Sequence, residues 1–183
     1  VFFGSAGSGQ AGSESGRSVA WAGDVNGDGY SDIVIGAPRH DNGQIDEGGA
    51  FVICGSAAGL PATPCWSAES NQANAQFGTS VATAGDVNRD GYSDVIVGAP
   101  GFDNGQADEG RAYVYHGSAS GLNATANWTA ESNQDYAGFG YSVSTAGGGN
   151  GDGFAEVIDG VYKEGTDQPG KGQGHIYHVL SSG

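Results

Sequence analysis

The sequence predicts an all-β fold, a β-propeller built from three four-stranded antiparallel blades. The first observation is a repeat. GDVNGDGYSD at Gly23–Asp32 returns as GDVNRDGYSD at Gly85–Asp94 and, altered, as GGGNGDGFAE at Gly147–Glu156, each copy starting 62 residues after the one before. A fixed period of this size indicates stacked units that bury their apolar faces against one another. The second observation is local: short apolar runs bounded by Gly, Pro, Asn and Asp indicate strands joined by turns.

The second unit shows the expected strands most clearly. The run Asp94–Val97 is almost continuously apolar, as expected for a strand that is covered on both faces. An apolar period of 3.6 residues nowhere extends beyond a turn or two, so no helix is expected. The four strands predicted for this unit are Thr79–Ala84, Asp94–Val97, Ala112–His116 and about Ala126–Ala130.

The phase of the repeat predicts how the blades are assembled. Phe3–Ala6 aligns with the fourth strand at Cys65–Ala68, whereas Gly174–Val179 aligns with a third strand. The chain therefore starts with a fourth strand and lacks one at its end, the offset by which a propeller closes. We expect one array over residues 1–183, with blades at about 17–70, 79–131 and 141–180 and with residues 1–6 as the closing fourth strand.

Three blades are fewer than the four to eight that propellers usually have. Two chains related by a two-fold axis would complete a six-bladed ring as a homodimer. The alternative is that the chain is a piece of a longer propeller.

The repeated acidic loop predicts a calcium site. Side-chain oxygens lie at positions 1, 3, 5 and 9 of the loop, from Asp24, Asn26, Asp28 and Asp32, and Tyr30 would add its backbone carbonyl. Ca²⁺ takes six to eight oxygen ligands, and a tightly wound loop presents alternate residues inward. The alternative is that Asp, Asn and Gly simply favour turns. The second loop repeats the set with Asp86, Asn88, Asp90, Tyr92 and Asp94.

The third loop departs from this pattern. Gly148 replaces the first Asp and Glu156 replaces the last, while Asn150 and Asp152 are kept and Phe154 stands at the carbonyl position. Since the number of charged ligands helps to set calcium affinity, this loop is expected to be weak or empty. The sequence thus predicts two Ca²⁺ ions per chain.

Two short segments flank each acidic loop. Phe77–Gly78 precedes the second loop and Gly98–Pro100 follows it, while the first unit has Ser15–Gly16 and Gly36–Pro38. With the acidic loop between them, these segments resemble the FG-GAP repeat of integrin alpha-subunit propellers. The resemblance implies calcium in the loop between the first two strands of a blade, and ligand binding outside the cell on the opposite face. That face would comprise Arg39–Gly48, Phe102–Gly110, Glu69–Gln76 and Glu131–Gly138.

Composition and cysteine content limit the partners and the compartment. Six Lys and Arg against 21 Asp and Glu give a net charge of −15, which argues against nucleic acid and anionic membranes as partners. No apolar run approaches 18 residues, so membrane insertion is not expected. Cys54 and Cys65 fall on neighbouring strands and could form a disulfide, which would indicate an oxidising, extracellular location; two free thiols are the alternative.

No pattern in the sequence indicates catalysis. There is no Gly-x-Ser-x-Gly motif, and His116 and His178 are repeat equivalents without an evident nucleophile partner. We therefore expect a calcium-stabilised, secreted propeller that acts as a protein-binding or adhesion module and not as an enzyme. One alternative is a lectin that uses Trp66 and Trp128 as sugar platforms, although these rings could instead pack between blades. Another is a designed or excised half-propeller without a ligand.

Overall fold

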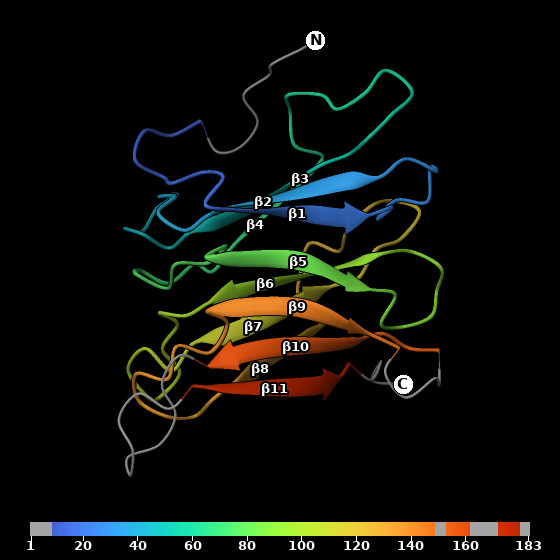
Figure 1. Ribbon diagram of the computed structural model, residues 1–183. Helices are drawn as coiled ribbons and strands as arrows, with labels where there is room; N and C mark the ends of the chain where they lie inside the picture. The colour runs from blue at the N-terminus through green and yellow to red at the C-terminus, as the bar shows by residue number, and fades with distance from the viewer. Residues whose placement is uncertain (1–8, 149–152, 162–171, 180–183) are drawn as a thin grey trace.

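The computed structural model describes residues 9–148, 153–161 and 172–179. Within these ranges the chain forms strands and turns without a helix, and so contains no helix that could span a membrane. Figure 1 shows three sheets stacked one beside the next along the chain. The eleven strands are β1 (Ser18–Gly23), β2 (Asp32–Ala37), β3 (Gly49–Ile53), β4 (Trp66–Glu69), β5 (Ser80–Gly85), β6 (Asp94–Ala99), β7 (Arg111–Tyr115), β8 (Trp128–Glu131), β9 (Ser142–Gly147), β10 (Glu156–Val161) and β11 (Gln173–His178).

The sheets have the topology of propeller blades, which confirms the predicted fold class. The first two run in sequence order, β1-β2-β3-β4 and β5-β6-β7-β8, and every neighbouring pair is antiparallel. The third is β11-β10-β9, and its predicted fourth strand at residues 1–6 lies outside the described residues. The predicted strands of the second unit are found, with ends displaced by no more than two residues, partly because turn residues such as Gly85 extend the pairing.

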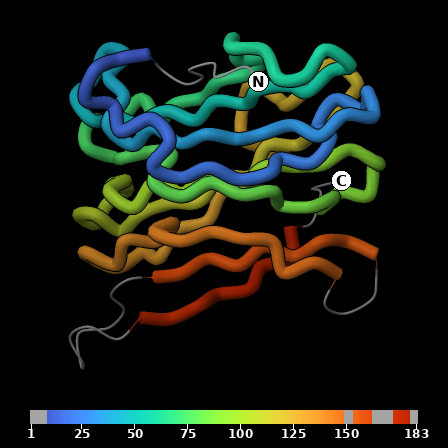
Figure 2. Tube along the Cα trace, turned by 45° about the horizontal axis from the view of Figure 1, so that its top comes forward, coloured from blue at the N-terminus to red at the C-terminus, as the bar shows by residue number. Residues whose placement is uncertain are grey.

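The first strands of the three blades lie side by side. Figure 2 shows β1, β5 and β9 following one another along the same edge of the stack. The core lies between successive sheets: Val34 and Val52 of the first blade are buried together with Val95 and Val97 of the second. Burying these side chains against the next blade stabilises each by about 1.5–3 kcal/mol relative to exposure. The blades therefore stabilise one another.

The Phe-Gly and Gly-Ala-Pro segments hold adjacent blades together. The N–H of Phe77 donates to the Glu47 carbonyl at 3.0 Å, and its ring is fully buried. A Cβ on Gly36 would lie 2.0 Å from the Gly78 carbonyl oxygen, so only glycine fits there. The same contacts recur one blade further on, from Phe139 to Glu109 and between Gly98 and Gly140.

Candidate calcium loops and ligand face

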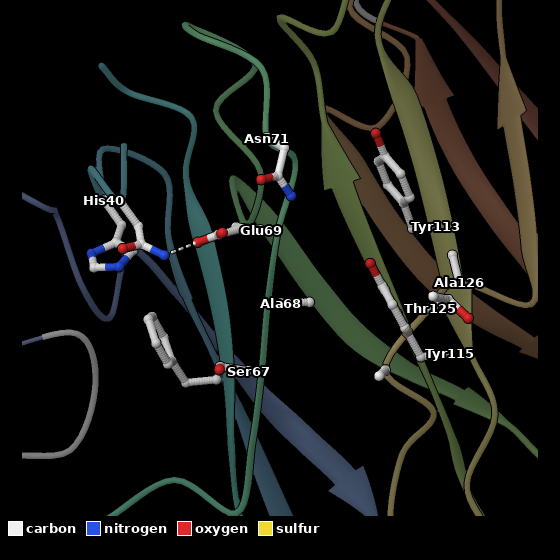
Figure 3. Close-up of a pocket in the computed structure, with 12 residues that line it drawn as sticks. His40, Ser67, Ala68, Glu69, Asn71, Tyr113, Tyr115, Thr125 and Ala126 are labelled. Atoms are coloured by element: carbon white, nitrogen blue, oxygen red, sulfur yellow. Dashed lines mark hydrogen bonds between the residues drawn. The ribbon is translucent and has the colours of Figure 1, made fainter. Parts of the chain in front are cut away.

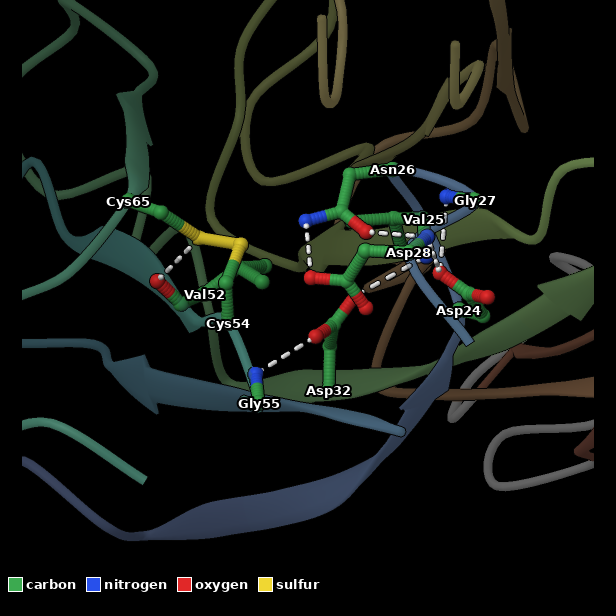
Figure 4. Close-up of a disulfide and its surroundings, with 10 residues drawn as sticks. All are labelled: Asp24, Val25, Asn26, Gly27, Asp28, Asp32, Val52, Cys54, Gly55 and Cys65. Carbon is green, nitrogen blue, oxygen red and sulfur yellow. Dashed lines mark hydrogen bonds between the residues drawn. A yellow bond between two sulfur atoms is a disulfide. The ribbon is translucent and has the colours of Figure 1, made fainter. Parts of the chain in front are cut away.

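The first acidic loop joins β1 to β2 and winds around one carboxylate. Asp24 Oδ1 accepts the N–H groups of Gly27 at 2.7 Å and Asp28 at 3.1 Å, and its Oδ2 accepts the N–H of Gly29 at 2.8 Å. Gly29 has φ +86°, a left-handed conformation that glycine adopts without strain. Figure 4 shows the side chains of Asp24, Asn26 and Asp28 grouped within this turn.

The last residue of the loop brings a buried carboxylate beside this group. Asp32 is fully buried, and its oxygens accept the N–H groups of Val25 at 2.9 Å and Gly55 at 2.7 Å. Burial raises the pKa of Asp32, and the negative charges of Asp28 and Asp24 raise it further, although the two N–H bonds oppose this. The loop therefore gathers negative charge that a bound cation would offset.

The second loop, between β5 and β6, repeats this geometry. Asp86 Oδ1 accepts the N–H of Asp90 at 3.1 Å, and Asp94 accepts those of Val87 at 2.8 Å and Gly117 at 2.9 Å. Burial raises the pKa of Asp94 to about 7, and the charges of Asp90 and Asp86 act in the same direction. The two loops, which differ only in having Gly27 or Arg89 at the fourth position, thus place their carboxylates in the same way.

The donor chemistry of both loops fits a hard divalent cation. Each loop offers three carboxylates and one amide oxygen within nine residues, the ligand type that Ca²⁺ prefers. Within the described ranges, no three His, Cys, Asp or Glu side chains already form a ligand set for a metal. The Asp24 and Asp86 oxygens instead accept N–H groups of their own loops. An ion bound in a loop would use the oxygen lone pairs that these N–H groups leave free.

The altered third loop is described only in part, because Asn150 and Asp152 lie outside the described residues. Glu156, at its last position, is buried, and its Oε1 lies 3.2 Å from Nδ1 of His178 on β11. Phe154 lies under the guanidinium of Arg89, 5.1 Å from the ring centre. These contacts tie the third loop to its neighbours.

A disulfide lies next to the first acidic loop. Cys54, just after β3, is bonded to Cys65, just before β4. Figure 4 shows this bond close to Asp32, which accepts the N–H of Gly55. In the loop-closure model, a cross-link of this span adds about 2–3 kcal/mol to the free energy of unfolding.

The loops at the opposite end of the blades are built around buried glutamates. Glu47 and Glu109 are both fully buried, and Glu47 Oε1 accepts the N–H groups of Asn42 and Gln44 from its own loop. Burial also raises the pKa of Glu109. This role was not predicted, although the sequence carries a signal for it: a Glu precedes Gly at the same place in both units.

On this face, each loop between the second and third strands of a blade is hydrogen-bonded to the loop that leads from that blade to the next. The N–H of Asn74 donates to the Ile45 carbonyl at 2.8 Å, and that of Tyr136 donates to the Ala107 carbonyl at 2.7 Å. Asn74 and Tyr136 are repeat equivalents with φ of 62° and 59°. Asparagine tolerates this conformation, whereas a bulky aromatic there is an outlier. Tyr136 nevertheless adopts this left-handed conformation, and 61% of its surface is exposed.

The two tryptophans considered as sugar platforms take part in packing between blades. The ring of Trp66 lies 4.8 Å from Tyr115, and its Nε1 donates to the Asn123 carbonyl at 2.9 Å. Trp128 lies 5.3 Å from Tyr177. These contacts favour packing between blades over a role as sugar platforms.

Comparison with known proteins assigns the repeats to a family. The model of the FG-GAP repeat matches residues 15–53 and 77–115. The chain contains FG-GAP repeats. It is 37% identical to human integrin alpha-6 over 121 residues (66% of this chain, 10% of the integrin) and 38% identical to human integrin alpha-7 over 135 residues (70% and 10%). It is 33% identical to chicken integrin alpha-V over 159 residues (80% and 15%).

The chain thus spans 10 to 15% of the length of these integrins, and the resemblance stated from its motifs is confirmed. The two FG-GAP matches include both intact acidic loops, Asp24–Asp32 and Asp86–Asp94. They also include the loops around Glu47 and Glu109. The matched segments therefore hold both the calcium candidates and half of the candidate ligand face.

Proposed function

We propose that this chain is a calcium-stabilised, extracellular propeller module that binds a protein ligand in adhesion and does not act as an enzyme. The observation that carries the proposal is the repeated acidic loop within FG-GAP matches shared with integrin alpha subunits. The disulfide supports an oxidising compartment. The net charge of −15 is consistent with a protein that binds cations.

Two Ca²⁺ ions per chain are proposed, one in each intact loop. The charged ligands would be Asp24, Asp28 and Asp32 in the first loop and their equivalents in the second, with Asn26 and Asn88 as amide ligands. Bound there, the ion would offset the charge of three carboxylates and fix the connection between the first two strands of a blade. The third loop, without an aspartate at its first position, would remain weak or empty.

The proposed ligand face centres on Tyr136. Exposed aromatic side chains on a rigid surface are frequent binding hot spots. Backbone strain also tends to be retained where it serves function. Since the equivalent residue of the first blade is Asn74, Tyr136→Asn would relieve the strain and remove the aromatic ring. We expect this variant to fold with equal or greater stability and to lose at least about ten-fold in ligand affinity.

Surface plasmon resonance against a panel of purified extracellular matrix proteins, together with a glycan array, tests this function. The expected result is calcium-dependent binding to one of these proteins, which Tyr136→Asn should weaken. The control variant Leu60→Asn, at an exposed apolar residue outside the ligand face, should leave the binding unchanged. Binding to glycans alone would favour the lectin alternative. Protein binding that persists unchanged in Tyr136→Asn would remove Tyr136 from the ligand face.

The two ends of the array support self-association. Val19 and Trp21 on β1 are 57% and 70% exposed. Val81, the equivalent of Val19 in the second blade, is instead buried in the core between blades. Ile176 is 65% exposed on the third blade, whereas its repeat equivalents Val52 and Val114 are fully buried. A second copy could cover both faces by repeating the contacts between blades. We therefore propose a six-bladed homodimer.

Light scattering in millimolar calcium measures this association directly. A mass of about 37 kDa, twice the 18.3 kDa of one chain, is expected. Trp21→Asp should shift the mass toward that of the monomer because it places a charge on the covered face. A wild-type mass near 18 kDa at all concentrations would contradict the dimer.

A further inference from the structure

The two intact acidic loops are in direct contact across the boundary between the first and second blades. The N–H of Ser93 in the second loop donates to the carbonyl of Asp24 in the first loop at 3.0 Å, and the N–H of Asp24 donates to Ser93 Oγ at 3.2 Å. Ser93 stands between Tyr92 and Asp94, two proposed ligands of its own loop. A proposed ligand of the first loop is therefore held by a residue that two proposed ligands of the second loop flank.

A second connection joins the buried carboxylates at the last position of each loop. Asp32 Oδ2 accepts the N–H of Val25 at 2.9 Å, and the carbonyl of Val25 accepts the N–H of Ser118 at 3.1 Å. The preceding residue, Gly117, donates its N–H to Asp94 Oδ1 at 2.9 Å. Asp32 and Asp94 are thus linked through the hydrogen bonds of Val25 and of the segment that contains Gly117 and Ser118.

The side chain at the carbonyl position of the second loop also packs on the first loop. A Cβ on Gly27 would lie 2.5 Å from Cε1 of Tyr92, so this ring lies directly over the backbone of the first loop. Tyr30, the equivalent of Tyr92, belongs to the first of the described loops in the stack and is 43% exposed. The repeat therefore offers the same residue in two settings, covered by a neighbouring loop and exposed.

The same contacts recur at the next boundary between blades. The N–H of Ala155 in the third loop donates to the carbonyl of Asp86 at 3.2 Å, as Ser93 donates to the first loop. Phe154 and Arg89, which lie 5.1 Å apart, take the places of the tyrosine ring and of the glycine under it. Contact between successive acidic loops is therefore a regular feature of the stack.

Elsewhere the first two blades leave open space between them. A cavity of about 510 Å³ lies between the fourth strand of the first blade and the third strand of the second. Figure 3 shows Glu69 of β4 on one side of this cavity and Tyr113 and Tyr115 of β7 on the other. The contacts between the acidic loops are therefore the more direct connection between the two proposed calcium sites.

We propose that the two calcium loops are coupled: an ion held by the second loop raises the calcium affinity of the first, and Ser93 and Tyr92 are the positioning residues that transmit the effect. When Tyr92 and Asp94 hold an ion, Ser93 between them is ordered as well. Asp24 is then already held in place before the first loop binds its own ion, so that loop loses less conformational entropy on binding. The coupling is reciprocal, because each ion must change the affinity for the other by the same factor. The inference rests on the proposed function only in taking both loops as calcium sites.

Electrostatic repulsion between the two sites acts in the opposite direction. Filling one loop partly neutralises its three carboxylates and so weakens the attraction of the pair of loops for a further cation. Salt screens this effect, since the Debye length is about 8 Å at physiological ionic strength. Hydrogen bonds and packing between the loops are not screened in the same way. The net coupling is therefore expected to favour binding at physiological salt and to increase at higher salt.

Calcium titrations followed by NMR at one amide in each loop test the coupling. Gly29 donates its N–H to Asp24 Oδ2 at 2.8 Å, and Gly91 donates its N–H to Asp86 Oδ2 at 3.0 Å, so each amide reports on its own loop. Asp86→Ala disables the second loop, and Asp24→Ala disables the first. In at least one of these variants, the intact loop should bind calcium at least about five-fold more weakly than in the wild type.

Charge alone predicts the opposite result. In the wild type, three carboxylates and one divalent cation leave the filled second loop with one negative charge. In Asp86→Ala the empty loop keeps two carboxylates and therefore two negative charges, which would attract an ion to the first loop more strongly. Weaker binding by the first loop in this variant would therefore come from the lost contacts between ordered loops.

A matched pair of substitutions tests the positioning role of Tyr92. Tyr92→Ala keeps the backbone carbonyl but removes the ring over Gly27, and in this background the affinity difference between the two-loop and single-loop proteins should become smaller. Tyr30→Ala makes the same change at the same position of the first loop, where the ring is exposed, and should leave the difference unchanged. Equal effects of the two substitutions would overturn the assignment of Tyr92.

The same titrations separate the coupling from the proposed function. If each intact loop binds calcium with the same affinity in the wild type and in the single-loop variants, the coupling is wrong and the two proposed calcium sites stand. If neither Gly29 nor Gly91 responds to calcium, both the coupling and the calcium sites of the proposed function are wrong.

Discussion

Removal of calcium by EDTA is expected to lower the melting temperature of the chain by about 10 °C or more. At a free concentration about 100 times its dissociation constant, each bound ion stabilises the folded state by about 2.7 kcal/mol. Two ions therefore supply about 5 kcal/mol, and in a chain of this size each kcal/mol shifts the transition by about 2–4 °C. Differential scanning calorimetry with and without EDTA measures the shift.

Single-loop variants distinguish specific binding from general charge screening. Asp86→Ala should remove about half of the calcium-dependent shift, since the loop at Asp24 remains intact. Magnesium at the same concentration should restore less stability because it favours strict octahedral geometry and keeps its waters. A transition that does not move in EDTA would contradict the proposed role of calcium in stability.

The blade architecture could be predicted from the sequence because its determinants are local. Apolar runs such as Asp94–Val97 and the turn residues around them specify strands, and the 62-residue period specifies how the units stack. The acidic loop carries its chemistry within nine consecutive residues. The strand ends differ from the expected ones by up to two residues because pairing across the sheet, and not the apolar run alone, decides where a strand ends.

The remaining features depend on neighbours that are distant in sequence. Glu47 looks like one of several acidic residues in a polar loop, yet it is fully buried because the loop folds around it. Tyr136 becomes unusual only when its backbone conformation and exposure are known. In each case the residue type alone does not show the burial or the backbone conformation that distinguishes the residue.

Asp159 is a buried carboxylate at a position where the other two blades have apolar residues, which predicts a cost in folding stability. It lies on β10 between Val143 of β9 and His175 of β11 in the strand register. Its equivalents in the first two blades, Ile35 and Val97, are buried and apolar. Asp159 is also buried, and neither carboxylate oxygen makes a hydrogen bond of acceptable geometry, although the N–H of Gly140 lies near enough to lower its pKa slightly. Burial dominates and raises the pKa of Asp159 to about 7.

This raised pKa makes stability fall as pH rises. Between the ordinary value of 3.8 and about 7, the folded state keeps a proton on Asp159 that the unfolded state has lost. The folded state is therefore favoured at low pH, and the advantage is gone above about pH 7. The full difference is about 4 kcal/mol.

Asp159→Val, which restores the residue of the second blade, is expected to remove this dependence. The gain in stability over the wild type should be largest at pH 8 and should shrink by about 4 kcal/mol toward pH 4. Urea unfolding of both proteins at several pH values measures the difference, so that the titration of Asp32 and Asp94 cancels between them. Asp159→Asn, which keeps the size and polarity but not the charge, should show the same flattened pH profile. A gain that is independent of pH would mean that Asp159 ionises normally in the folded state, and its cost would then lie in packing alone.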